Sequence, residues 1–110
     1  CPACRRPADL RDLLPAVLPR RRGSAPGPFF SGQGCAACRG SGARVLEPVL
    51  ELMTAFPGEP LAPAGASARD LRERHVAGGM DTLFLAGLRK ASAGTLDVRE
   101  PLRLLLYEQP

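Results

Sequence analysis

Two pairs of cysteines constrain this chain more than any other feature of its sequence. The four cysteines form two Cys-x-x-Cys motifs, Cys1 to Cys4 and Cys35 to Cys38, and about 30 residues separate the motifs. Each motif can place two thiolates on one side of a tight turn, and two such turns facing each other complete the tetrahedral shell that zinc accepts. The sequence therefore predicts one zinc site with Cys1, Cys4, Cys35 and Cys38 as ligands. Because no ligand position is left for water, this site is expected to be structural.

Other uses of the cysteines stay open at this point. The second motif continues into Gly40 and Gly42, which allow the backbone to turn close to a metal and favour a metal knuckle over a disulfide. An arginine-rich chain without a secretory signal segment is typical of a reducing compartment, where structural disulfides are rare. A thioredoxin-like redox pair is disfavoured because neither motif lies between a clear strand and a helix. Iron can also occupy four thiolates.

Length and charge limit the remaining possibilities. A chain of 110 residues has room for one small domain or two subdomains with a modest core that a metal would reinforce. The net charge of +4 comes almost wholly from arginine, and the one dense basic run, Arg20 to Arg22, is interpreted as a solvated loop. Aromatic residues make up only 5%, so stacking platforms for nucleic acid are scarce. No apolar run approaches the ~20 residues of a membrane span, and we expect a soluble protein.

The first half of the chain predicts little regular structure. Helical spacing of apolar residues predicts a short helix over residues 8–18, kinked at Pro15. Phe29 and Phe30 predict a short strand that belongs to a minor β-hairpin. Residues 44–53 fit one helical face and equally a strand, and the periodicity does not decide between them. A proline-rich stretch then predicts a loop.

Three helices are predicted in the second half. Ser67 is expected to cap the first helix, with Asp70 at its third position, and Gly78 to end it. Met80 to Ala91 supply the apolar face of the second helix, which Gly94 ends, and Asp97 begins the third. We expect a mainly α fold in which a small zinc-knuckle subdomain precedes a three-helix bundle. The expected divisions are a tetracysteine subdomain at residues 1–55, a linker at 56–66 and a helical subdomain at 67–110.

The second cysteine motif and its flanks carry a family resemblance. The run Gly34-Cys-Ala-Ala-Cys38-Arg-Gly-Ser-Gly42, about 30 residues after the first motif, resembles the tetracysteine region near the C-terminus of type II secretion and type IV pilus assembly ATPases. The second half supports this independently, with three stretches that are similar to the same family: Ala77-Gly-Gly-Met80-Asp-Thr-Leu83, Gly87-Leu88-Arg89-Lys90, and Asp97 to Leu104 with Glu100 and Arg103. The resemblance covers nearly the whole chain.

The resemblance implies a role inside a motor protein. The family hydrolyses nucleotide in an upstream RecA-like domain, whose phosphate-binding loop and magnesium-binding acidic residue are absent from this sequence. The chain is therefore expected to be a C-terminal fragment that is inactive alone, with structural Zn2+ as cofactor. Implied partners are the upstream domain, neighbouring subunits of a hexamer and the inner-membrane platform protein, with nucleic acid unlikely. The implied location is cytoplasmic and peripheral at the inner membrane.

No catalytic or cofactor-binding set emerges beside the cysteines. His75, the only histidine, lies on a charged predicted helix and is interpreted as solvated. The serines have no histidine partner in a recognisable motif, and the acidic residues are expected to form solvated ion pairs. Arg44, which matches the family near the second motif, is interpreted as a surface residue. An independent zinc-binding adaptor that recognises protein or nucleic acid is the alternative function.

Overall fold

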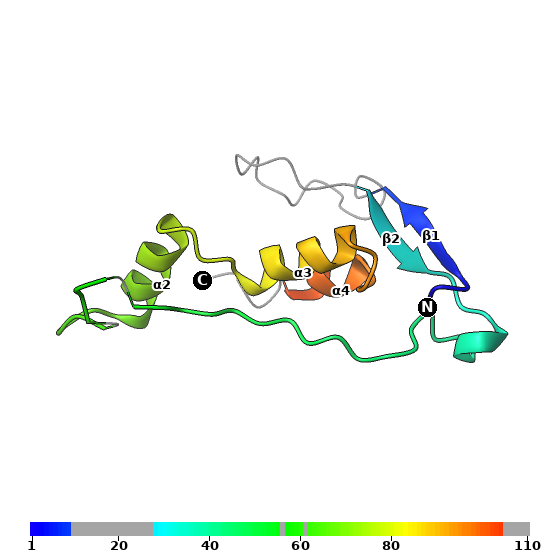
Figure 1. The fold of residues 1–110 in the computed structure, drawn as a ribbon, viewed down its shortest axis with the longest axis horizontal. Coiled ribbons are helices and arrows are strands. Elements are labelled where there is room, and N and C mark those ends of the chain that lie inside the picture. The colour runs from blue at the N-terminus through cyan, green and yellow to red at the C-terminus, as the bar shows by residue number, and fades with distance from the viewer. Residues whose placement is uncertain (10–27, 56, 61, 105–110) are drawn as a thin grey trace.

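The structure places a small hairpin flanked by the four cysteines beside a pair of helices. The computed structural model describes residues 1–9, 28–55, 57–60 and 62–104 (Figure 1). Its elements, in chain order, are β1 Arg5–Ala8, β2 Phe29–Gly32, the 3-10 helix η1 Ala36–Cys38, and the α-helices α2 Ala68–Ala77, α3 Leu83–Ser92 and α4 Arg99–Leu104. The described part of the chain is thus mainly helical, with one two-stranded sheet. The longest helices there have ten residues, too few to cross a membrane.

The two strands form an antiparallel hairpin that confirms the strand predicted at Phe29. The pairing register runs from Arg5 opposite Gly32 to Ala8 opposite Phe29. On β2, Phe29 and Ser31 are buried, while Phe30 and Gly32 are half-buried. This alternation turns the Phe29 ring toward the helices. Of the helix predicted over residues 8–18, Ala8 lies in β1 and Asp9 in no regular element, and residues 10–18 lie outside the described residues.

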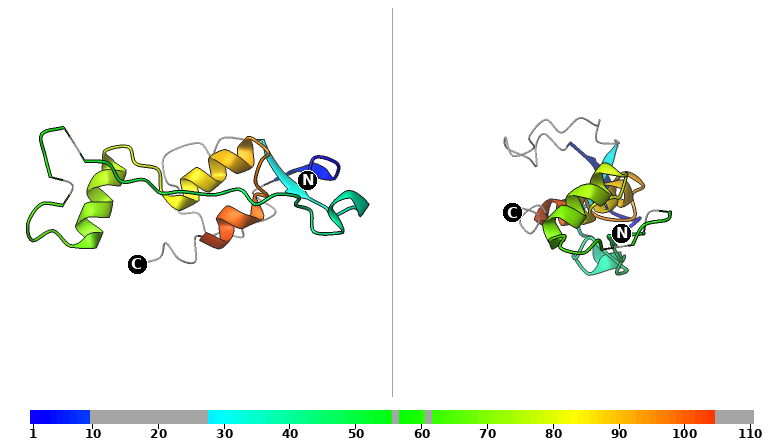
Figure 2. Two further views of the ribbon diagram at one scale, coloured as in Figure 1. Left: turned by 60° about the horizontal axis from the view of Figure 1, so that its bottom comes forward. Right: turned by 90° about the vertical axis from the view of Figure 1, so that its left-hand side faces the viewer.

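The hydrophobic core lies between the hairpin and the last two helices. Its buried members come from β2, α3 and the start of α4, and they are Phe29, Phe84, Leu88, Ala91 and Val98, with Ala8 and Leu102 packed against them. Figure 2 shows α3 and α4 lying alongside each other next to the hairpin. Residues from both ends of the chain therefore share one core. The predicted divisions at residues 55 and 66 stay a prediction.

Helix ends follow the predicted capping residues closely. The Ser67 hydroxyl accepts from the Asp70 backbone N–H at 3.1 Å, and the Asp70 carboxylate accepts from the Ser67 N–H at 3.1 Å, which completes a capping box at the start of α2. The second predicted helix begins later than expected, at Leu83, because the Thr82 side chain caps it by accepting from Leu85 N–H at 3.2 Å.

The predicted three-helix bundle is not found among the described elements. Only α3 and α4 pack closely on each other, while α2 lies beyond the first turn of α3 (Figure 1). The sequence of α2 explains this, since Leu71 and Val76 are its only large aliphatic side chains and both stay half-buried. Two such residues give too narrow an apolar stripe to bind a helix pair.

Residues 44–53 form neither of the two predicted elements. The segment 43–55 runs without regular secondary structure past α3 and α2 (Figures 1 and 2). Glu51 fastens it by accepting from the Leu83 backbone N–H at 3.0 Å and pairing with Arg72 at 3.4 Å. Pro48 removes a backbone donor from the segment, which disfavours a helix or a sheet strand there.

The contact between α3 and α4 depends on a glycine. A Cβ at Gly87 would lie 2.8 Å from the Cβ of Pro101, so an alanine at this position would not fit without movement of α4. Pro101 is fully buried in the first turn of α4. Backbone N–H groups in the first turn of a helix have no partner within the helix, so proline, which lacks this group, is tolerated there. Gly87 therefore sets the close approach of the two helices.

We predict that Gly87→Ala destabilises the protein by about 1–2 kcal/mol, because overpacking at this close contact, about 2–3 kcal/mol, outweighs the ~1 kcal/mol by which alanine favours a helix over glycine. Urea unfolding of the metal-loaded chain measures this. Leu85→Ala is the matched control on the same helix, since Leu85 is 42% exposed, and it should cost less than about 1 kcal/mol. A Gly87→Ala protein as stable as its parent would contradict the prediction.

Candidate metal centre

The four cysteines converge on one point although their motifs lie far apart in sequence. Their sulfur atoms all lie within 4.8 Å of one another. The Sγ atoms of Cys1 and Cys35 are 4.0 Å apart, those of Cys4 and Cys38 are 3.8 Å apart, and those of Cys35 and Cys38 are 3.7 Å apart. A tetrahedral zinc ion with Zn–S bonds of about 2.3 Å requires sulfurs about 3.8 Å apart. The cage therefore fits such an ion and can hold a metal.

The same distances disfavour the disulfide alternative. A disulfide needs sulfurs about 2.05 Å apart, and all four cysteines are free in the structure. Cys4 and Cys38 are buried, whereas Cys1 and Cys35 are partly exposed. The cage thus has one side covered by protein and one side near solvent, which is a route by which a metal can enter.

The second knuckle presents backbone donors to its sulfur. Cys35 begins the 3-10 helix η1, and its N–H donates to Cys38 Sγ at 3.2 Å, as does the Gly42 N–H at 3.2 Å. Burial of the Cys38 thiol opposes its ionisation, but these two donors, together with hydrogen bonds from the Cys35 and Cys4 thiols, outweigh burial and lower the pKa of Cys38 to about 6. Two glycines with positive φ follow, Gly40 and Gly42, as the sequence suggested. Arg39, with φ 54°, is a left-handed residue that the sequence did not reveal.

The first knuckle is held in place by the hairpin. The Cys4 N–H donates to Cys1 O at 3.3 Å, which closes the turn, and the Gln33 N–H donates to Cys4 O at 3.2 Å. Burial raises the pKa of Cys4 above its usual range. A metal ion would displace the proton of Cys4, because a bound cation stabilises the thiolate against this burial.

Two glycines let separate backbone segments cross beside the cage. A Cβ at Gly32 would lie 2.2 Å from Gly42 O, and a Cβ at Gly42 would lie 2.8 Å from Gly32 O. The Cys1 nitrogen donates to the same Gly42 carbonyl at 2.8 Å. Gly32 was not singled out from the sequence, since a glycine at a strand end carries no local signal for a crossing partner ten residues away.

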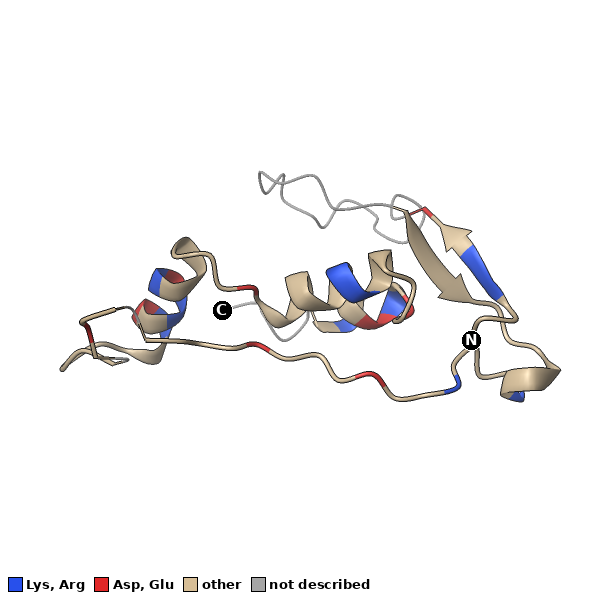
Figure 3. Ribbon diagram, in the orientation of Figure 1, with Lys and Arg blue, Asp and Glu red and all other residues tan. Residues whose placement is uncertain are grey.

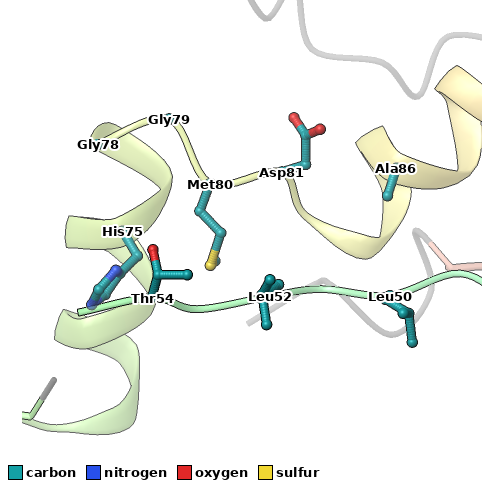
Figure 4. Close-up of a pocket in the computed structure, with 9 residues that line it drawn as sticks. All are labelled: Leu50, Leu52, Thr54, His75, Gly78, Gly79, Met80, Asp81 and Ala86. Carbon is teal, nitrogen blue, oxygen red and sulfur yellow. The ribbon is translucent and has the colours of Figure 1, made fainter. Parts of the chain in front are cut away.

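Other residues considered in the sequence lie outside the cage. His75 is only 4% exposed, so its interpretation as a solvated residue is wrong. It lines a pocket of about 410 Å³ together with Thr54, Leu52 and Met80, at the end of the molecule away from the cysteines (Figure 4). Segment 43–55 covers this side of α2. The prediction for His75 considered only the residues of its own helix and so did not include this cover. Arg44 is exposed, as predicted.

Acidic residues are paired with arginines, as the sequence suggested. Figure 3 shows basic residues on β1 and residues of both charge signs on the helices. Exposed pairs include Arg69 with Glu73 at 2.9 Å and Arg89 with Asp81 at 2.9 Å. Such solvated pairs contribute little free energy each. They do not assemble the paired acid and base of a catalytic site.

Four cysteines from two knuckles, braced by a hairpin and a helix pair, define a tetracysteine cluster that can hold a metal ion. A comparison with characterised proteins gives a relative of this chain. Over 105 aligned residues, which cover 91% of the chain, the sequence is 33% identical to the type IV pilus assembly ATPase PilB of Myxococcus xanthus (strain DK1622). The chain is thus homologous to a segment of a type IV pilus assembly ATPase, as its motifs predicted.

The chain spans about 18% of the length of that relative. No family model matches the sequence, and no solved structure matches it. The homology therefore relates the chain to one segment of a much longer protein, while the structure supplies the geometry of the cysteine cage.

We predict that each chain binds one equivalent of zinc, and that Cys35→Ser lowers this to well below one equivalent because the cage loses a thiolate ligand. Elemental analysis of the purified protein gives the stoichiometry. Ser92→Ala serves as control, since Ser92 lies on α3 outside the cage. Metal-free protein with its four thiols oxidised in pairs would contradict the prediction.

Proposed function

We propose that the chain is the zinc-stabilised C-terminal region of a type II secretion or type IV pilus assembly ATPase, and that its role is structural and force-transmitting. Cys1, Cys4, Cys35 and Cys38 bind the zinc. The observation that carries the proposal is the homology to PilB over 91% of the chain, and the convergence of the four cysteine sulfurs supports it.

The chemistry of the cage supports a structural role for the metal. Four thiolates satisfy a tetrahedral zinc ion completely, so no site is left for an activated water or a substrate. When bound, zinc would supply a cross-link between the segment that precedes β1 and the segment that follows β2. A small core benefits most from such a link.

The arrangement of the core supports transmission of force. Phe29 of the hairpin packs with Phe84 and Leu88 of α3, and the Val98 N–H donates to Phe30 O at 3.0 Å. The hairpin therefore contacts the helix pair directly, and the Gln33 N–H, which donates to Cys4 O, links the hairpin to the cage. A movement imposed on one of them would be passed to the others, because packed interiors deform little.

The implied partners follow from the proposed parent protein. They are a RecA-like ATPase domain upstream in the same polypeptide, neighbouring subunits of a hexamer, and the inner-membrane platform protein. In this proposal the protein works in the cytoplasm, bound peripherally to the inner membrane through these partners. Its divisions are the tetracysteine subdomain, the linker and the helical subdomain at the boundaries predicted from the sequence.

The sequence of the parent protein upstream of Cys1 tests the proposal. A Gly-x-x-x-x-Gly-Lys-Ser/Thr motif on a strand-to-helix turn is expected there. If no such motif is present and the isolated chain binds DNA in a salt-dependent manner, the alternative of an independent adaptor is correct.

We predict that this chain alone neither binds nor hydrolyses ATP, because its sequence supplies no phosphate loop and no magnesium-binding acidic residue. Titration calorimetry with MgATP should give no saturable heat. The matched positive control is the full-length parent protein under the same conditions. Saturable binding by the 110-residue chain would contradict the prediction.

A further inference from the structure

One rung of the hairpin lies directly beside the metal cage. Arg5 pairs with Gly32 at the end of the sheet, and Cys4 immediately precedes Arg5. On the other strand, Gly32 leads through Gln33 to the knuckle that begins at Cys35, and the Gln33 N–H donates to Cys4 O. We refer to the Arg5–Gly32 pair as the metal-proximal rung. Its position determines where both knuckles emerge from the sheet.

The start of α4 binds the Gly32 side of this rung. The Gly32 N–H donates to Asp97 Oδ2 at 2.8 Å, and an Arg99 guanidinium N–H donates to Gly32 O at 2.9 Å. Arg99 also donates to the Asp97 carboxylate at 2.7 Å. Partial burial disfavours the charged carboxylate, but the Arg99 side chain and the backbone donors of Arg99 and Gly32 outweigh it and lower the pKa of Asp97 to about 2. Asp97 is therefore ionised at neutral pH.

The end of α3 binds the Arg5 side of the same rung. The Arg5 guanidinium donates to Gly94 O at 2.9 Å and lies 5.0 Å from the centroid of the Phe30 ring. A Cβ at Gly94 would lie 2.5 Å from the Arg5 guanidinium, so the contact is close. Both residues of the metal-proximal rung are thus held by the helix pair, although neither helix contributes a cysteine.

The route from the rung to a sulfur atom is short. Gly32 crosses Gly42 in backbone contact, and the Gly42 N–H donates to Cys38 Sγ at 3.2 Å. The Gly42 carbonyl accepts from the Cys1 nitrogen at 2.8 Å. A shift of Gly32 would therefore move a residue that contacts both knuckles.

We infer that Asp97 and Arg99 are positioning residues of the metal centre, which raise its affinity for metal by holding the metal-proximal rung in place. The inference rests on the proposed function in one respect, namely that the cage binds zinc. By linkage, metal binding must stabilise the contact of α4 with the hairpin by the same factor. Groups that orient ligands from outside the cage typically change metal affinity 10–100-fold.

The test compares the metal affinity of variants of the 110-residue chain. Asp97→Asn keeps the size of the side chain but replaces one of the two accepting carboxylate oxygens and removes the charge that pairs with Arg99. It should weaken zinc affinity about 10-fold in competition with a chromophoric chelator. Glu73→Gln is the matched control, because Glu73 is an exposed carboxylate on α2 that also pairs with an arginine, Arg69, and it should leave the affinity unchanged.

The absorption spectrum of bound cobalt(II) reports on the ligands, so the loss of a ligand would change it. Because Asp97 is not a ligand, the Asp97→Asn protein at saturating cobalt should show the same tetrahedral thiolate spectrum as its parent, reached at a higher cobalt concentration. Unchanged zinc affinity in Asp97→Asn overturns the inference. If Asp97→Asn does not fold, Arg99→Lys, which keeps the charge but loses the forked contact, must show the weakened affinity instead.

Leu88→Ala separates positioning from a general loss of stability. Leu88 is buried in the shared core, a cluster that includes neither Arg5 nor Gly32. If Leu88→Ala weakens zinc binding as much as Asp97→Asn, the effect comes from global folding and the inference is wrong. A parent chain that binds no zinc at all refutes the proposed function itself, whereas a zinc-binding parent with an unaffected Asp97→Asn variant refutes only the positioning role.

Discussion

The pairing of β1 with β2 is the interaction on which the rest of the structure depends. It brings Cys4 beside Gln33, two residues before Cys35, and so places the two cysteine motifs next to each other. The same pairing turns Phe29 into the core that α3 and α4 complete. A two-stranded hairpin alone is marginal in water, so its stability must come from the cage at one end and the helices on one face.

Features that depend on neighbouring residues in the sequence, such as helix ends, could be predicted from the sequence. Ser67 with Asp70, Gly78 and Gly94 gave the helix boundaries, because caps and left-handed residues act within one turn. The spacing of the cysteines likewise gave the composition of the cage, since a knuckle is a local structure. Phe29 was predicted as strand from its own β propensity.

Longer-range features could not be predicted for identifiable reasons. The bond between Gly32 and Asp97 joins residues 65 positions apart, and no pattern in a single sequence pairs them. Three successive short helices suggested a bundle, although the large aliphatic side chains of α2 are only Leu71 and Val76. The charge of its helix predicted that His75 is solvated, whereas in the structure segment 43–55 covers it. In each case the outcome was decided by a contact between distant segments rather than by propensity.

Segment 43–55 has a consequence for the behaviour of the chain in concentrated solution. Leu46, Leu50 and Leu52 are 97%, 73% and 73% exposed on an extended stretch without a strand partner, a combination that in other proteins promotes edge-to-edge association and fibre growth. Pro48 and the acidic Glu47 and Glu51 interrupt the run. Proline and charge at such positions act as gatekeepers, because neither is tolerated inside a stacked, dry sheet. Pro48, Glu47 and Glu51 are thus expected to oppose association of copies of the chain through segment 43–55.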